Sequence, residues 1–350
     1  MKHNLKNMNK IFLSSVFCFL SIAIASAQSA TYHLPKTALR ISVLVEKKSY
    51  TPGRLSEYAN RFLKKNVEQE AFDHYRIINQ DLELYAIPDS SRIFEAKLEN
   101  KLNITSFSLT EDNILLGINA EGKGPKIKEP FVPAPKPEPL DPYKYLSQEI
   151  VSTGSKLKMP ELCANEIFDI RESINELTRG QADYMPKDGL QLEIMLKNLS
   201  TQEKAIRQFF EGVTTTDTLE HVFIYVPEKE KQKEILYRFS SHFGMVDTDD
   251  LSGEPYYAIV EDLHSIPEYI NEPGKKTPKD ETGIWISLPG KVRFSLAYGE
   301  KTLKTLEFSA SQFGEIENLN EPLFSKKVNT TLLLHPYNGG IEKIESVQIR

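Results

Sequence analysis

The sequence has almost no cysteine. Two occur, Cys18 and Cys163, and only Cys163 lies beyond the first twenty-seven residues. Because those residues have the pattern of a cleavable signal, an intramolecular disulfide is excluded in the mature chain. Cys163 has no neighbouring histidine and no C-x-x-C partner. Free cysteines usually behave as small hydrophobic residues, so we predict a structural role for Cys163.

Motifs of the common enzyme classes are also missing. The chain has no H-E-x-x-H, G-x-S-x-G, Walker or G-x-G-x-x-G pattern. The histidines beyond residue 27 show no metal-ligand spacing. They are His33, His74, His221, His242, His264 and His335. The sequence therefore predicts no catalytic residue, no metal ligand and no cofactor.

One acidic stretch, residues 244–254, resembles half of a calcium loop through Asp247, Asp249 and Asp250. It lacks the glycine at the sixth position and the correctly spaced final glutamate of such a loop. We interpret it as an acidic β-turn.

Long apolar runs are confined to the N-terminus. Lysines precede the run Ile11–Ala25, and small residues follow it up to Ala27, as in a secretory signal. We predict cleavage after Ala27 and export of the mature chain. The alternative is a lipoprotein anchored at Cys18, but Phe17 before it and its position inside the apolar run argue against lipidation. No later segment approaches the ~20 apolar residues of a spanning helix, so no transmembrane segment is expected in the mature chain.

Positive charge is in short supply. The formal net charge is −6, and residues 1–27 carry three lysines and no acid, so their removal leaves −9. The basic runs, such as Lys47-Lys48 and Lys275-Lys276, are pairs only. An acidic surface without a basic cluster disfavours nucleic acid as a partner.

The one long run with helical periodicity is 164–212. Its first part spaces Ile167, Ile170, Ile174 and Leu177 by three and four residues. Asn165 is suited to begin this helix, and Arg179 followed by Gly180 is suited to end it.

The second part of the run begins at Asp188, which can cap a helix with Gln191 three residues on. The capping-box pattern from Ser200 to Glu203 predicts a restart, so we expect two helical pieces or one kinked helix. Its many apolar residues predict that this part is largely buried. Asp183 and Asp188 in the loop before it suit a turn and a cap; a cation or ligand site is the alternative.

The remaining chain alternates polar and apolar residues, as β-strands do. Seven prolines within Glu121–Pro142 predict an extended linker. We predict an α+β fold with a β-rich N-terminal domain, a Pro-rich linker, a helical connector and an antiparallel, β-sandwich-like C-terminal domain. The predicted boundaries are 1–27 for the signal peptide, 28–120 for the β-rich domain with one helix, 121–160 for the linker, 161–213 for the helical unit and 214–350 for the β domain.

Two further residues of the last part attract attention. The only tryptophan, Trp285, lies in a strand pattern. We expect it to pack against the helical unit; a sugar-binding surface is the alternative. Thr218, in Asp217-Thr218-Leu219, matches a short pattern for the attachment of O-linked glycans. This match would support export and no other property.

Several stretches together are similar to a known family. They are Tyr32–Leu39, Ser49–Gly53 with Tyr58-Ala59, Asp188-Gly189, Gln202–Lys204 and Phe210–Thr216. They resemble the exported proteins of Bacteroides-type bacteria grouped as domain-of-unknown-function family 4831, over Tyr32 to about Gly340. The resemblance implies a location in the periplasm or at the cell surface of a Gram-negative bacterium, and it supplies no activity, cofactor or site residue.

Two functional hypotheses follow from these features. The first is a non-catalytic binding or structural module of the cell envelope for a protein or glycan partner. The alternative is a carboxylate-dependent hydrolase of envelope or dietary glycan or peptide. Such an enzyme needs two acids some ~5–10 Å apart in a cleft, which a sequence with 49 acidic residues cannot reveal.

Overall fold

The computed structural model describes residues 29–97, 102–126, 128–136, 138–266, 283–319 and 321–349. The predicted signal, with Cys18 and the cleavage position after Ala27, lies outside these residues. The α+β class with antiparallel sheets is confirmed. Among the described helices, none is long and apolar enough to cross a membrane.

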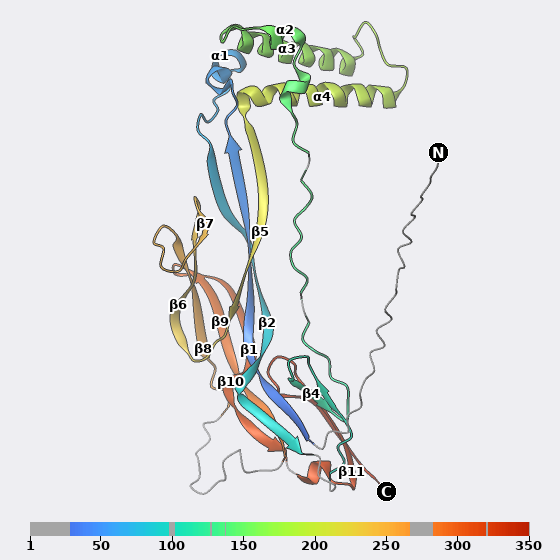
Figure 1. Cartoon of the computed structure of the whole chain (residues 1–350), viewed down its shortest axis with the longest axis vertical. Coiled ribbons are helices and arrows are strands. Elements are labelled where there is room, and N and C mark those ends of the chain that lie inside the picture. The colour runs from blue at the N-terminus through green and yellow to red at the C-terminus, as the bar shows by residue number, and fades with distance from the viewer. Residues whose placement is uncertain are drawn as a thin grey trace, which may run out of the picture.

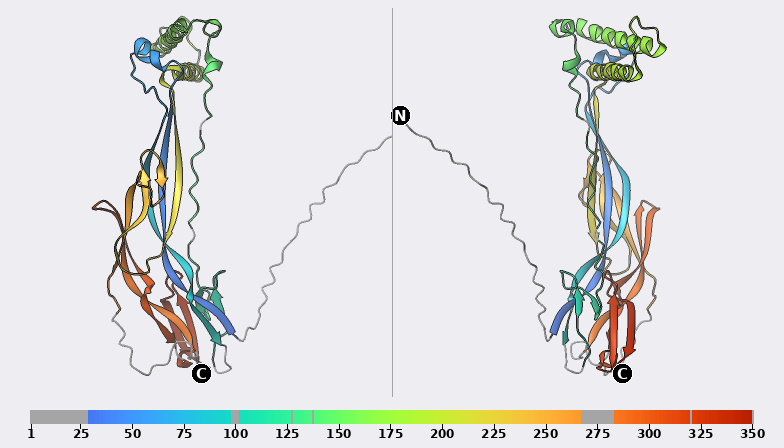
Figure 2. Two further views of the ribbon diagram at one scale, coloured as in Figure 1. Left: turned by 60° about the vertical axis from the view of Figure 1, so that its left-hand side comes forward. Right: turned by 90° about the vertical axis from the view of Figure 1, so that its right-hand side faces the viewer.

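The molecule is elongated, with helices at one end and most of the strands toward the other (Figure 1). A three-stranded antiparallel sheet in the order β2-β1-β5 runs from the helices down into the strand-rich end (Figure 2). Its strands are β1 (Ser29–Thr51), β2 (Phe72–Lys97) and β5 (Val213–Tyr225). We call this sheet the stalk.

Strand β1 organises the stalk. It pairs with β2 from Ser29 opposite Lys97 to Tyr50 opposite Phe72, and with β5 from Leu39 opposite Tyr225 to Thr51 opposite Val213. The alternating residues Leu39, Ile41, Val43 and Val45 are all buried. The half-buried strand predicted from that alternation is therefore confirmed.

A five-stranded antiparallel sheet in the order β10-β9-β8-β6-β7 packs on the inner face of the stalk. Its strands are β6 (Lys231–Ser240), β7 (Gly244–Val246), β8 (Glu254–Asp262), β9 (Ile284–Tyr298) and β10 (Lys301–Leu319). Between the two sheets, the alternating residues of β1 meet Tyr237, Val260, Phe294 and Leu296. Packing of two sheets over one core is a sandwich arrangement. The sequence predicts a sandwich within residues 214–350, whereas one of the two sheets, the stalk, contains β1 and β2 from the N-terminal part of the chain.

A second core lies at the end farthest from the helices. A four-stranded sheet in the order β12-β11-β4-β3 covers it, with β3 (Phe107–Leu109), β4 (Leu115–Ile118), β11 (Val328–Leu334) and β12 (Ile341–Gln348). Beside β11 lies a short 3₁₀ helix, Glu321–Phe324. Strands from both sides of the Pro-rich segment share this sheet and the stalk, so long-range pairing holds the β parts together. The domain boundaries given from the sequence stay a prediction.

Trp285 belongs to this second core. It is 8% exposed and stacks on Phe94 with ring centroids 5.5 Å apart. The Tyr32 hydroxyl donates to the Trp285 carbonyl at 3.0 Å and accepts from the Trp285 amide at 2.7 Å. The prediction that Trp285 packs against the helical unit is wrong, because the strand that carries it runs through the opposite end of the molecule.

The Pro-rich segment runs the length of the stalk on its outer face (Figure 1). Lys128 binds Asp81 and Glu83 of β2 at 2.6 and 2.9 Å, and the Phe131 amide donates to Glu220 of β5 at 3.0 Å. The segment is extended, as predicted, and these contacts also fix it to the sheet.

Helices form the other end, which we call the head. They are a 3₁₀ turn (Ser56–Tyr58), α1 (Ala59–Leu63), a second 3₁₀ turn (Pro142–Tyr145), α2 (Gln148–Ser152), α3 (Lys158–Arg179) and α4 (Gly189–Glu211). Helices α3 and α4 form an antiparallel hairpin. Gly180 ends α3 in the left-handed conformation, which confirms the predicted stop.

Two helix predictions are wrong. Helix α3 begins at Lys158, so Asn165 lies inside it; Pro160 and Cys163 of the extra turns are buried in the head. Helix α4 is continuous through Ser200 and does not restart there, and the Thr201 hydroxyl donates to the Lys197 carbonyl within the helix.

Candidate functional site

The head joins the stalk through a close approach of two backbone segments. Gly212, between α4 and β5, has φ +72° and ψ −169°, and a Cβ there would lie 2.3 Å from the Thr51 carbonyl oxygen. A Cβ on Gly53 would lie 2.3 Å from the Phe209 carbonyl oxygen. Only glycine fits both positions, so each side of this contact depends on the absence of a side chain.

Hydrogen bonds and packing close this junction. The Leu55 amide donates to the Phe209 carbonyl at 2.6 Å, and the Tyr50 hydroxyl donates to the Glu68 carbonyl at 2.9 Å. The apolar core of the head adjoins this junction, because Leu55 and Phe209 belong to both. The buried residues of this core are Leu55, Ala59, Ile150, Cys163, Ala164, Ile167, Ile170, Ile206, Phe209 and Phe210. The junction therefore ties the head to the end of the stalk by backbone contacts and by a shared apolar core.

Cys163 is fully buried in this core. Burial, with a smaller effect of Glu166, raises the pKa of its thiol to about 11. A protonated, inaccessible thiol is a poor nucleophile, and its packing confirms the structural role predicted for it.

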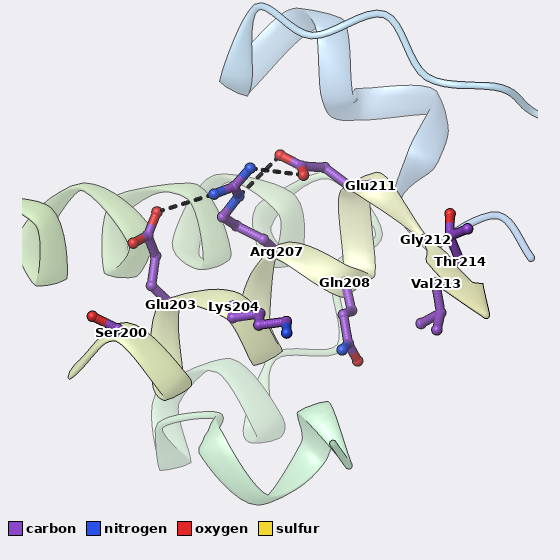
Figure 3. Close-up of a pocket in the computed structure, with 9 residues that line it drawn as sticks. All are labelled: Ser200, Glu203, Lys204, Arg207, Gln208, Glu211, Gly212, Val213 and Thr214. Atoms are coloured by element: carbon purple, nitrogen blue, oxygen red, sulfur yellow. Dashed lines mark hydrogen bonds and ion pairs between the residues drawn. The ribbon is translucent and has the colours of Figure 1, made fainter. Parts of the chain in front are cut away.

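A groove of about 420 Å³ lies in the angle between α4 and the start of β5 (Figure 3). It is lined by Ser200, Glu203, Lys204, Arg207, Gln208, Glu211, Gly212, Val213 and Thr214. The spacing of three and four places the α4 members on one face of that helix.

Ion pairs run along this groove. Arg171 binds Glu203 at 2.7 Å, Arg207 lies between Glu203 and Glu211 at 3.6 and 2.8 Å, and Lys65 binds Glu211 at 2.7 Å. Burial acts to raise the pKa of Glu211, but hydrogen bonds from Lys65 and Arg207 outweigh it and lower the pKa. The groove thus holds Glu211 as an ionised, paired carboxylate, whereas a general acid needs a raised pKa.

The far end of the α3/α4 hairpin carries exposed apolar side chains, which we call the hairpin tip. Tyr184 is 74% exposed, Leu190 68%, Ile194 52% and Met185 38%. The prediction that the second helical part is largely buried is wrong for this half of α4. Only its last turns, with Ala205, Ile206, Phe209 and Phe210, are buried, because α4 projects sideways beyond the width of the stalk (Figure 1).

The family model of the domain of unknown function DUF4831 matches residues 28–342. The chain belongs to the DUF4831 family. No curated protein and no solved structure matches it.

Two of the stretches by which this DUF4831 chain resembles its family come together in the structure. Ser49–Gly53 and the start of Phe210–Thr216 meet at the junction, through Gly53 and Gly212. Sequence reasoning missed this contact. A signal was available, since each glycine lies where a strand pattern adjoins a helical pattern.

Asp183 and Asp188, in the loop between α3 and α4 of the DUF4831 chain, have different surroundings. Asp188 caps α4 by accepting from the Gln191 amide at 2.7 Å, which confirms the predicted cap. Asp183 is exposed in the bend between the helices.

The acidic stretch of the last part of the DUF4831 chain is a turn between β7 and β8. The Asp250 amide donates to the Asp247 carbonyl at 3.0 Å, and the Ser252 amide donates to the Asp250 carboxylate at 2.8 Å. The predicted acidic turn is confirmed. Over the described ranges, no group of three or more His, Cys, Asp or Glu side chains is arranged to hold a metal ion.

The short glycan-attachment pattern of the DUF4831 chain lies within β5. Thr218 pairs with Glu46 of β1, and Asp217 forms an ion pair with Lys136 of the Pro-rich segment. Both residues are thus part of the stalk.

Proposed function

We propose that this DUF4831 protein is an exported, non-catalytic module of the cell envelope, in which the stalk holds out the helical head and the hairpin tip binds another protein. The observation that carries the proposal is the exposure of Tyr184, Leu190 and Ile194 at the end of the hairpin. Large apolar side chains gathered on an exposed projection are typical of a binding surface. Export rests on the signal pattern of residues 1–27.

The chemistry of the tip favours protein over glycan. Three of its four apolar side chains, Met185, Leu190 and Ile194, are aliphatic or thioether groups, which pack into apolar surfaces of proteins. Sugar rings are bound by flat aromatic faces with polar groups around them. Tyr184 is the tip's single aromatic ring, so the tip offers too little stacking surface for a glycan.

The junction supports the same function. Gly53 and Gly212 let the end of α4 and the end of β1 approach closely, and Leu55 and Lys65 bind the last turn of α4 from α1 and its flanking segments. A head fixed in this way presents its tip in one orientation, which lowers the entropy lost on binding.

The experiment is affinity capture from the envelope fraction of cells that produce the protein, using the wild type, Leu190→Asp/Ile194→Asp and a control, Leu251→Asp. Leu251 is 84% exposed in the turn before β8, so the control places a single aspartate at a well-exposed leucine position outside the head. The double variant preserves folding because both side chains project into solvent, and acids near a helix start are favourable. Each captured protein is then purified and its affinity measured by calorimetry.

We expect the double variant to bind the purified partner at least tenfold more weakly than the wild type and the control. Equal affinities for all three variants would overturn the assignment of the tip. Binding to a glycan array that depends on Tyr184 would replace protein by glycan as the partner class. Turnover in a screen of glycans and peptides, lost on changing a single carboxylate, would favour the hydrolase hypothesis instead.

A further inference from the structure

The last strand of the chain, β12, lies at the end of the molecule opposite the head (Figure 1). It is the outermost strand of its sheet, and all eight of its residues are exposed. Ile341, Ile344 and Val347 are 39%, 40% and 66% exposed. No described strand pairs with its outer edge. Such an edge offers free backbone donors and acceptors to another strand.

The register with β11 shows which groups face outward. The ladder is regular from Val328 opposite Gln348 to Leu333 opposite Lys343, and the Ile349 amide donates to the Lys327 carbonyl at 2.8 Å. Backbone groups alternate in direction along an antiparallel strand. The odd-numbered residues therefore bond to β11, whereas Ile344 and Ser346 point their amides and carbonyls to the free edge.

We infer that β12 pairs with β12 of a second copy of this chain, antiparallel and centred on Ile344. In this register Ile344 lies opposite Ile344, and Lys343 lies opposite Glu345, all within the part of β12 that pairs regularly with β11. The Lys343–Glu345 pair occurs twice because a two-fold axis relates the copies, and the apolar pair of Ile344 with its own copy lies on that axis. The strand thus complements itself in charge and in apolar side chains, and the two four-stranded sheets become one.

Neighbouring registers are worse. Centring the pair on Lys343 puts lysine against lysine, and centring it on Glu345 puts glutamate against glutamate. Centring on Ser346 puts Lys343 opposite Ile349 and Glu345 opposite Val347, which loses both ion pairs. Like charges directly opposite one another destabilise a sheet. Ile344 is therefore the centre that the sequence of the strand selects.

Within one chain, Lys343 and Glu345 already lie 2.8 Å apart on one face of β12. In the pair of copies, these four charges form one alternating cluster. Because these side chains are 59% and 60% exposed in the single chain, changing them leaves the fold of each copy intact.

The test is the molar mass of the purified protein by sedimentation over a range of concentrations, with two charge variants. We expect a dimer for the wild type, about tenfold weaker association for Lys343→Glu, and recovery in Lys343→Glu/Glu345→Lys. The tip variant Leu190→Asp/Ile194→Asp leaves this dimer unchanged, so the result is independent of the proposed function. A monomer at all concentrations, or a dimer indifferent to Lys343→Glu, would overturn the inference.

Disulfide trapping gives a direct readout of the register. Ile344→Cys places two thiols on the two-fold axis, where paired Cα atoms lie about 5.5 Å apart, within the range for a disulfide. Val347→Cys is the matched control, because its two copies would lie about 20 Å apart along the strands. Cys163 is fully buried in the head and cannot contribute. We expect oxidation to link the Ile344→Cys copies alone; linkage of Val347→Cys instead would contradict this register.

Discussion

The junction between head and stalk makes a sharp prediction for Gly212→Ala. Backbone angles of φ +72° and ψ −169° are open almost only to glycine, and a residue forced there costs about 1–3 kcal/mol. The new Cβ would also lie 2.3 Å from the Thr51 carbonyl oxygen, so backbone on one side must move. Together we expect a loss of about 3 kcal/mol or more in the free energy of unfolding.

Thermal melting followed by far-ultraviolet circular dichroism measures this loss. With an unfolding entropy of about 2.1 cal/mol/K per residue, a loss of about 3 kcal/mol in a chain of 350 residues corresponds to a fall of roughly 4 °C in the melting temperature. Gly189→Ala is the control, because a Cβ there meets nothing within 4 Å and alanine suits the first turn of α4. Gly53→Ala should resemble Gly212→Ala, because its Cβ would lie 2.3 Å from the Phe209 carbonyl oxygen.

Local exchange of backbone amides locates the damage. In Gly212→Ala, the Leu55 amide should lose protection, because it donates to the Phe209 carbonyl across the junction. A melting temperature for Gly212→Ala equal to that of Gly189→Ala, with the Leu55 amide still protected, would refute the account of the junction.

Two smaller predictions concern the stalk and the second core. Tyr32→Phe removes the hydroxyl that bonds both the amide and the carbonyl of Trp285 in a buried site, so we expect about 1–3 kcal/mol of destabilisation in urea denaturation, and an unchanged midpoint would contradict it. Hydrogen bonds from the Ser42 hydroxyl and the Phe131 amide lower the pKa of Glu220, so its stabilising effect is complete above the ordinary carboxyl pKa and is lost as pH falls through the lowered value. We therefore expect the free energy of unfolding to fall less steeply in acid for Glu220→Gln than for the wild type. Parallel curves of this free energy against pH for the two proteins would contradict the role of Glu220 in holding the Pro-rich segment.

Local patterns predicted local structure well. The alternation in β1, the cap at Asp188 and the stop at Gly180 depend on residues within a few positions of one another, and the structure confirms all three. The start of α3 was predicted too late because Asn165 has the chemistry of a cap. Packing of Cys163 and its neighbours in the head core extends the helix over that signal.

Long-range structure was beyond the sequence. Leu39 and Tyr225 pair although they are 225 − 39 = 186 positions apart in the chain, and no local pattern specifies that register. The contact of Trp285 with Tyr32 and the attachment of Phe131 to Glu220 likewise join residues that are far apart in the sequence. The exposure of the hairpin tip is beyond the sequence for a related reason. The apolar content of α4 does not show which part of this helix is covered by α3 and the stalk.

The most direct test of the proposed function is photo-crosslinking in living cells. A benzophenone side chain is placed at Leu190 in the hairpin tip and, separately, at Leu251 outside the head. The account predicts a covalent adduct with one envelope protein from position 190 and none of that adduct from position 251. The same adducts from both positions would contradict the account. The absence of any adduct from position 190 would also contradict it.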